Sequence, residues 1–370
     1  MVAQSTFSIS GRVLSEETNH PLNGASIYIN SSTIGTTSND SGFFKLSNVG
    51  NGFYDIVVSY VGHEKIVYRA IVQSKDLAIT FNLVKKPTEL RNIVVLSKDA
   101  KKRWMSIFRE NFLGITVAAE RSTIQNEDEI LFEDGSRDSI KAFSTVPLEI
   151  VNRELGYRIF FELEDFYYNS REGSTYFYGY SRFEELKENG KVPVKYLRNR
   201  ERYYMGSTMH FYHSLIDNKA ETEGFNLLNI RTIVMGDSAA NKEPTKIVNN
   251  SNGNIIVKKP NQMLAGYPVK ADKIFKKENI NETEVYALEW KEKLRVIYTK
   301  NPFGKNYLKS KRPMFQGNLP TGVSSDIIML VSPAYMDSNG CLYNPLALQM
   351  SGYWSYEKLA NMLPIDYRPR

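Results

Sequence analysis

The chain of 370 residues carries 47 lysines and arginines against 41 aspartates and glutamates, is 42% hydrophobic and has one cysteine. These values exclude an intrinsically disordered protein, a collagen-like repeat and a disulfide scaffold, which need few apolar residues, a glycine at every third position or many cysteines. The length predicts two or three folded units of ordinary size.

The net charge of +6 does not predict nucleic-acid binding. The densest groups of lysine and arginine, at residues 98–103 and 305–312, are short and mixed with polar and apolar residues. A stripe that binds phosphates would gather such charges on one element, so we expect a solvated surface and no nucleic-acid partner. No run reaches the roughly 18 apolar residues of a membrane-spanning helix. We therefore expect no transmembrane helix.

The first residues predict export. Val2-Ala3-Gln4 resembles the small-residue end of a cleaved signal peptide, with a methionine added in front for expression. We expect a protein of the periplasm or the outer membrane whose signal peptide is absent from this chain. Cys341 is the single cysteine and has no histidine near it in sequence, so we expect a structural thiol and no nucleophile.

Residues 7–86 show short runs of alternating apolar and polar residues, broken by turns at fairly even spacing. A period of two predicts strands with one face in a core, and the even spacing predicts two packed sheets. We predict a β-rich chain with two parts joined by a linker. The first part, residues 1–86, forms a seven-stranded antiparallel β-sandwich, residues 87–98 form the linker, and the second part, residues 99–370, forms an α+β domain.

Five motifs of the first part occur in an ordered series. They are Gly11-Arg-Val13, Leu22-Asn-Gly24-Ala25-Ser-Ile27-Tyr-Ile29, Gly42-Phe-Phe44-Lys-Leu46, Gly52-Phe-Tyr54-Asp-Ile56 and Ser59-Tyr60-Val61-Gly62-His63. Together they resemble the carboxypeptidase-regulatory-like domain, a transthyretin-like sandwich, although His63 stands where that family usually has tyrosine. The resemblance implies an accessory module of exported Gram-negative envelope proteins, with no catalysis of its own.

The start of the second part predicts a helix. Over residues 99–113, Trp104, Ile107, Phe108 and Phe112 follow helical spacing, and Gly114 ends the pattern. The favoured interpretation is that this aromatic face packs in a core at the domain junction. A groove for a partner is the alternative, so Trp104 is also a candidate binding residue.

Residues 129–186 predict strands at 129–133, 139–145, 156–169 and 175–182, the last two joined by a turn at 169–174. In the last strand Tyr176, Tyr178 and Tyr180 share one face. A packed sheet is the favoured interpretation, because aromatic residues suit half-buried pleated surfaces. A row of tyrosines can also bind a glycan or an extended peptide, so these three residues are candidate binding residues.

Residues 196–217 predict one helix that places His210 and His213 on one face, within reach of one metal ion. A zinc carboxypeptidase needs His-x-x-Glu and a distant histidine, with the fourth position open for water. None of the four histidines begins that pair, and no carboxylate at i+1 or i+4 from His210 completes another metalloprotease motif. We favour a structural role for both histidines, and we predict no metal and no cofactor.

The remaining residues predict strands and basic loops. We expect a turn at 249–254, a hairpin of 285–290 and 294–299 about 291–293, an exposed loop at 300–325, a pair of strands at 327–335 and 342–350, and a terminal helix at 356–363.

The second part also resembles a known group of sequences as a whole. The motifs are Glu110-Asn111-Phe112-Leu113-Gly114, Pro147-Leu148-Glu149-Ile150, Leu155-Gly156-Tyr157, Glu223-Gly224-Phe225, Ser351-Gly352-Tyr353-Trp354 and Leu363-Pro364-Ile365-Asp366-Tyr367. They resemble an uncharacterised family of two-domain Gram-negative envelope proteins. The resemblance implies an architecture and an envelope location, but no active site.

The serine-elbow, phosphate-loop and dinucleotide motifs do not occur. Our main hypothesis is therefore a non-catalytic exported subunit of the cell envelope that docks on an outer-membrane or periplasmic protein, with Arg368 and Arg370 as further candidate binding residues. The first alternative is glycan or peptide binding through the tyrosines. The second is a hydrolase with an unrecognised pair of carboxylates or a site around His210.

Overall fold

The computed structural model describes residues 6–86, 96–133, 138–234, 247–249, 255–257, 262–280, 283–300, 307 and 322–369. The predicted linker at 87–98, the turn at 249–254, the loop at 300–325 and Arg370 lie wholly or largely outside these residues. In the described part of the chain, no helix is both long and apolar enough to cross a bilayer.

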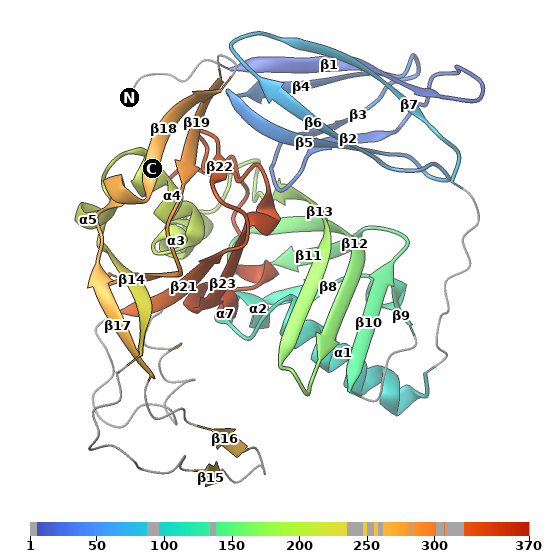
Figure 1. Cartoon of the computed structure of the whole chain (residues 1–370). Helices are drawn as coiled ribbons and strands as arrows, with labels where there is room; N and C mark the ends of the chain where they lie inside the picture. The colour runs from blue at the N-terminus through green and yellow to red at the C-terminus, as the bar shows by residue number, and fades with distance from the viewer. Residues whose placement is uncertain are drawn as a thin grey trace, which may run out of the picture.

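Residues 6–86 form two packed sheets at the top of Figure 1. One sheet has the order β4 (Phe43–Val49), β1 (Phe7–Ser15), β7 (Leu77–Leu83), and the other has the order β3 (Gly35–Thr37), β2 (Ser26–Ile29), β5 (Gly52–Ser59), β6 (Ile66–Val72). The predicted seven-stranded sandwich is confirmed. The prediction that all strands are antiparallel is wrong for β1 and β7, which pair in parallel because the chain changes sheets between β6 and β7.

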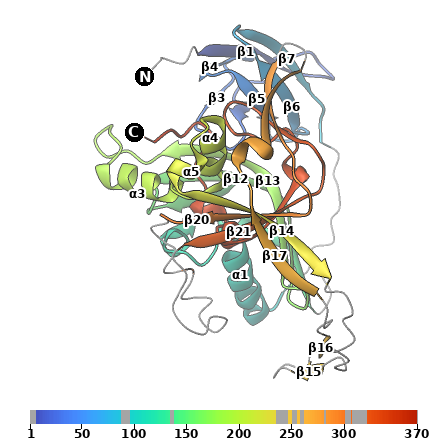
Figure 2. The same ribbon diagram turned by 60° about the vertical axis from the view of Figure 1, so that its left-hand side comes forward.

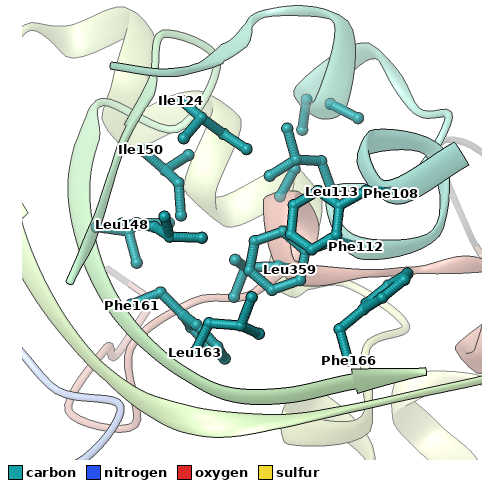
Figure 3. Close-up of a cluster of buried hydrophobic side chains, with 14 of the residues drawn as sticks. Phe108, Phe112, Leu113, Ile124, Leu148, Ile150, Phe161, Leu163, Phe166 and Leu359 are labelled. Atoms are coloured by element: carbon teal, nitrogen blue, oxygen red, sulfur yellow. The ribbon is translucent and has the colours of Figure 1, made fainter. Parts of the chain in front are cut away.

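The next part is a curved sheet covered by one helix. Its strands are β8 (Ser122–Ile124), β11 (Leu148–Asn152), β12 (Tyr157–Asn169), β10 (Ser139–Ser144), β9 (Ile130–Glu133) and β13 (Ser174–Glu185), which pairs with β12. The covering helix α1 (Lys98–Phe112) confirms the predicted helix, and α2 (Val117–Glu120) and a 3-10 turn (Glu127–Glu129) follow it. In Figure 3, Phe108 and Phe112 of α1 face Phe161 and Phe166 of β12 across the core. Leu359 from the end of the chain enters the same core.

The single helix predicted over 196–217 is wrong, since two helices occupy this stretch. They are α3 (Val194–Tyr204) and α4 (Thr208–Ile216), followed by α5 (Ala220–Glu223). Gly206 takes a φ of +86° between them, which a helix does not allow. Ser207 then begins α4, because its hydroxyl accepts a hydrogen bond from the His210 N–H at 3.2 Å.

The rest of the chain builds a five-stranded sheet, a three-stranded sheet and a ribbon. The first has the order β17 (Gln262–Pro268), β14 (Phe225–Val234), β20 (Lys293–Tyr298), β21 (Val323–Met329), β23 (Leu348–Gly352). The second has the order β18 (Phe275–Ile280), β19 (Thr283–Leu288), β22 (Ala334–Met336), and β15 (Ile247–Asn249) pairs with β16 (Ile255–Val257). Short helical turns are Ala271–Lys273, Pro345–Ala347, α7 (Tyr353–Tyr356) and Leu359–Asn361.

Three local predictions for this region need correction. The hairpin expected about residues 291–293 does not form, because β19 and β20 pair with strands of different sheets. The two strands expected at 327–335 and 342–350 pair as β21 and β23. Between them, however, β22 pairs with β19 in the three-stranded sheet. The terminal helix is replaced by α7 and the 3-10 turn Leu359–Asn361.

The buried apolar residues of the described chain form three clusters. One lies inside the sandwich, one lies between α1 and the curved sheet, and one surrounds α4 and the five-stranded sheet. The β-rich fold class is confirmed, whereas the domain boundaries at 1–86, 87–98 and 99–370 stay a prediction.

Candidate functional site

The sandwich, α4 and the end of the chain meet at a turn, residues 337–341, which we call the junction turn. The Asp337 side chain is 2% exposed and accepts hydrogen bonds at 2.9 Å from the backbone N–H groups of Phe53, Asn339 and Cys341. Burial raises the pKa of the Asp337 carboxyl, and these three donors oppose the rise. A sandwich residue therefore helps to satisfy a buried carboxyl of the second part.

Asn339 adds a second contact with the sandwich and connects the junction turn to two more segments. Its Nδ2 donates to the carbonyl oxygen of Asn51 at 2.8 Å, and its Oδ1 accepts from Nη2 of Arg368 at 2.8 Å. Its backbone carbonyl accepts from Nε2 of His213 on α4 at 2.9 Å. The sandwich approaches the junction turn so closely at Gly52 that a Cβ added to this residue would lie 2.4 Å from Asn339 Nδ2.

A second contact joins the sandwich to the edge of β13. The Ser31 N–H donates to the carbonyl oxygen of Ser181 at 2.7 Å, and the Phe183 N–H donates to that of Ser32 at 2.9 Å. The Tyr28 hydroxyl also donates to Glu162 at 2.7 Å. Figures 1 and 2 both show the sandwich lying over α4 and over the ends of β12 and β13.

A cavity of about 490 Å³ lies where these parts meet. The sandwich supplies one wall, α4 a second, and the chain from the junction turn to residue 365 the third. Its lining includes Phe53, Asp55, Arg69, Met209, Tyr212, Cys341, Leu342, Met350, Trp354, Glu357, Lys358 and Met362. Pockets of this volume between domains commonly hold small molecules.

The ionisable side chains that line this cavity include Asp55, Arg69, Cys341, Glu357 and Lys358. Asp55 and Arg69 form an ion pair at 2.7 Å. Burial raises the pKa of the Glu357 carboxyl to about 8 and also raises the pKa of the Cys341 thiol. Burial lowers the pKa of the Lys358 amine. Glu357 is therefore largely protonated at pH 7 and can donate a hydrogen bond.

The tyrosine face, defined as Tyr176, Tyr178 and Tyr180 on β13, lies on the side of the sheet opposite α1. Tyr176 and Tyr178 are each 46% exposed, whereas Phe177 on the other side of the strand packs against Phe112 of α1. The hydroxyls of Tyr178 and Tyr180 share a hydrogen bond, and their rings meet at 70°. Lys65 of the sandwich lies 5.1 Å from the centre of the Tyr180 ring.

The other predicted binding residues have structural contacts. Trp104 is partly buried, and its ring packs edge-on against Phe132 at 5.5 Å. The Arg368 guanidinium donates to Asn339 and to the carbonyl oxygens of Ile365 and Tyr367. Arg370 lies outside the described residues. The structure thus brings Arg368 to the junction turn and does not bring it to the tyrosines.

His210 and His213 both pack against Tyr204, and each ring has polar partners. His210 Nδ1 accepts from the Gly206 N–H at 3.0 Å, and its Nε2 lies 3.4 Å from Glu223. His213 Nδ1 accepts from the Tyr204 hydroxyl at 2.9 Å. Burial lowers the pKa of both imidazoles. Within the described ranges, no three histidine, cysteine, aspartate or glutamate side chains gather as a metal site.

Sequence reasoning missed Asp337, Asn339 and Glu357. The stretch from Asp337 to Gly340 has the composition of a turn, and only that local property was available from the sequence. The side chains of Asp337 and Asn339 instead bind backbone groups of the sandwich, nearly 300 residues earlier in the chain. Glu357 follows an aromatic run and has no sequence pattern that indicates burial.

Comparison with known proteins identifies the first part of the chain. The family model of the CarboxypepD_reg-like domain matches residues 9–95, which confirms the resemblance of the sandwich. No curated protein matches the chain.

Similarity to solved structures is weak. A proposed membrane-associated protein of unknown function from Bacteroides fragilis is 9% identical over 95% of this chain and 96% of that chain, with a TM-score of 0.19. A proposed carbohydrate-binding protein from Bacteroides uniformis is 9% identical over 79% and 88%, with a TM-score of 0.19. A cohesin–X-dockerin complex from Acetivibrio cellulolyticus is 15% identical, and this chain spans 56% of that chain and 21% of its own length, with a TM-score of 0.19. These TM-scores carry no inference about function.

Proposed function

We propose that this chain is a non-catalytic binding or assembly protein of the cell envelope, exported to the periplasm or the outer membrane, which docks on a partner protein there. One observation carries the proposal. Tyr176 and Tyr178 are half exposed on a sheet whose other face is packed against α1. Tyrosine is enriched at protein interfaces, because it offers a large contact area with a polar end at a low entropic cost.

The edge of β13 supports an extended protein segment as the ligand. Along the described chain, β13 pairs with β12 over residues 174–185, and the sandwich covers its other edge at residues 181–183. Residues 174–180 of that edge have no strand partner among the described residues. A strand with one open edge can add a partner strand through backbone hydrogen bonds, while side chains beside the edge select the partner. The tyrosine face lies beside this edge and would supply that selection.

Glycan binding is the second candidate and is less favoured. Sugars stack on flat, exposed aromatic faces, but the rings of Tyr178 and Tyr180 contact each other at 70° with centres 5.5 Å apart. Tyr180 is also partly covered by Lys65. The chain offers tyrosine edges and hydroxyls here, which suit a peptide backbone better than a sugar ring.

Site-specific crosslinking in envelope preparations tests the proposal. A photoreactive phenylalanine at position 176 or 178 should give one defined protein adduct. The same residue at Tyr267, which is 47% exposed on β17, should give none. Equal patterns at all three positions, or no protein adduct at 176 and 178, would contradict the proposal, and adducts with polysaccharide alone would favour the glycan candidate.

A further inference from the structure

The cavity at the junction turn is large enough and apolar enough to hold a small molecule. Its volume of about 490 Å³ falls in the range of pockets that enclose drug-sized ligands. Its walls come from three parts of the chain that are tied together by hydrogen bonds at Asp337 and Asn339. The cavity therefore exists before any ligand arrives, which reduces the entropic cost of binding.

The apolar lining is rich in methionine. Met209, Met350 and Met362 line the cavity, and Trp354 and Leu342 complete much of its apolar surface. Methionine side chains are flexible and polarizable, so they adapt to ligands of varied shape. A flexible apolar chain or a small ring system suits such walls better than a polar metabolite.

Glu357 provides a polar group in these walls. It is half-buried, and its carboxyl has Tyr353 as a hydrogen-bonding neighbour. The titratable groups around it are Tyr203 of α3, Tyr353 and Tyr356 of α7, and Lys358, while Asp55, Arg69 and Cys341 line the same cavity. Asp55 and Arg69 neutralise each other. A protonated carboxyl in such surroundings favours an uncharged ligand that accepts a hydrogen bond.

We propose that this cavity binds an uncharged, elongated apolar molecule that carries a hydrogen-bond-accepting oxygen, with the oxygen at Glu357 and the apolar body among the three methionines. This site is separate from the tyrosine face and does not depend on the proposed docking function.

Nile red, an uncharged apolar dye with a carbonyl oxygen, tests the proposal with the full chain. We expect saturable binding of one dye per chain at pH 7, with emission shifted to the blue, and displacement by dodecanol. Met350→Arg should weaken binding by about tenfold or more, because it places a charge in the cavity. Leu330→Arg adds the same charge at a residue that is 60% exposed and does not line the cavity, and it should leave binding unchanged.

Two further variants keep the test decisive. If Met350→Arg fails to fold, Met209→Trp fills the cavity with an apolar side chain and should also weaken binding. A paired Tyr176→Ser and Tyr178→Ser change should leave dye binding intact, which separates this site from the docking proposal. Unsaturable binding, or binding that Met209→Trp and Met350→Arg both leave unchanged, would overturn the proposal.

The role of Glu357 has its own measurement. Raising the pH from 7 to 9.5 should weaken dye binding severalfold, because the carboxyl then loses its proton and its donor function. In Glu357→Gln the amide still donates at both pH values, so that fall should disappear. A fall of equal size in both proteins would place the oxygen-binding group elsewhere and overturn the assignment of Glu357.

Discussion

The Asn339 side chain donates a hydrogen bond to the carbonyl oxygen of Asn51 at 2.8 Å, although 288 residues separate the two in sequence. The contact is not isolated, since Asp337 beside it accepts from the Phe53 N–H. Backbone groups at the start of β5 thus complete the hydrogen bonding of the junction turn in the second part. The docking of the two parts is therefore part of the fold.

Asn339→Ala should destabilise the protein by about 2 kcal/mol, because it removes the donor to the part-buried Asn51 carbonyl and one of the acceptors of the Arg368 guanidinium. Urea unfolding monitored by tryptophan fluorescence measures this loss. Asn23→Ala is the matched control, because Asn23 makes an exposed hydrogen bond to Asp40 inside the sandwich. Equal losses for both variants would mean that the junction turn contributes nothing beyond an ordinary surface contact.

Gly52→Ala should be far more disruptive than Gly62→Ala. Both glycines have a positive φ, of +155° and +77°. A Cβ at Gly52 would lie 2.4 Å from Asn339 Nδ2 and 2.6 Å from Asp337 Oδ2, whereas none of the described atoms lies within 4 Å of one at Gly62. Both changes place an alanine at a positive φ, and only Gly52→Ala adds a clash with the junction turn, so we expect a difference in unfolding free energy of about 2 kcal/mol. Thermal unfolding measures it, and equal midpoints would contradict this geometry.

Lowering the pH should reduce the free energy of unfolding through His213. Burial lowers the pKa of its imidazole to about 4, and the nearby Arg368 charge adds to this effect. The unfolded chain binds a proton at this histidine below about pH 6.5 while the folded chain does not, so stability falls as the pH drops from about 6.5 towards 4.

Between pH 7.5 and pH 5, the free energy of unfolding of His213→Gln should therefore fall by about 1 to 2 kcal/mol less than that of the unchanged protein. Urea unfolding at the two pH values gives this difference. His20→Gln, a change at an exposed histidine, is the control and should behave as the unchanged protein does. If the unfolding free energy of His213→Gln fell as much as that of the unchanged protein, groups other than His213 would cause the loss of stability in acid.

Glu357 should destabilise the folded protein as the pH rises, whereas His213 does so as the pH falls. Its pKa is raised by burial to about 8, so the folded chain keeps a proton that the unfolded chain releases above about pH 4.5. Stability is thus lost as the pH rises from about 4.5 towards 8. Glu357→Gln should raise the unfolding free energy at pH 7 by about 1 to 2 kcal/mol and leave it nearly unchanged at pH 4.5.

Thermal unfolding of Glu357→Gln at pH 4.5 and pH 7 checks the last expectation. Glu16→Gln, a change at an exposed carboxylate, is the matched control and should shift neither value. A Glu357→Gln variant that is destabilised at pH 7 would show that the carboxylate is ionised and paired in the folded protein.

The sequence by itself determined the elements whose pattern depends on near neighbours. Alternation predicted the strands of the sandwich, and helical spacing of Phe108 and Phe112 predicted α1 within one residue at each end. The period of two also placed Tyr176, Tyr178 and Tyr180 on one face of a strand. It could not say which face α1 would cover, and the exposure of these tyrosines follows from that choice.

Only the tertiary structure decided which strands pair and which polar groups meet. β19 and β20 are neighbours in sequence but belong to different sheets, since β19 pairs with β18 and β22 whereas β20 pairs with β14 and β21. Asp337 and Asn339 have the composition of a turn, and their partners lie in a segment far away along the chain. Burial of Glu357 likewise depends on three walls that come together only when the chain is folded. Local patterns reflect contacts between near neighbours, whereas such sites depend on contacts that no short stretch of sequence contains.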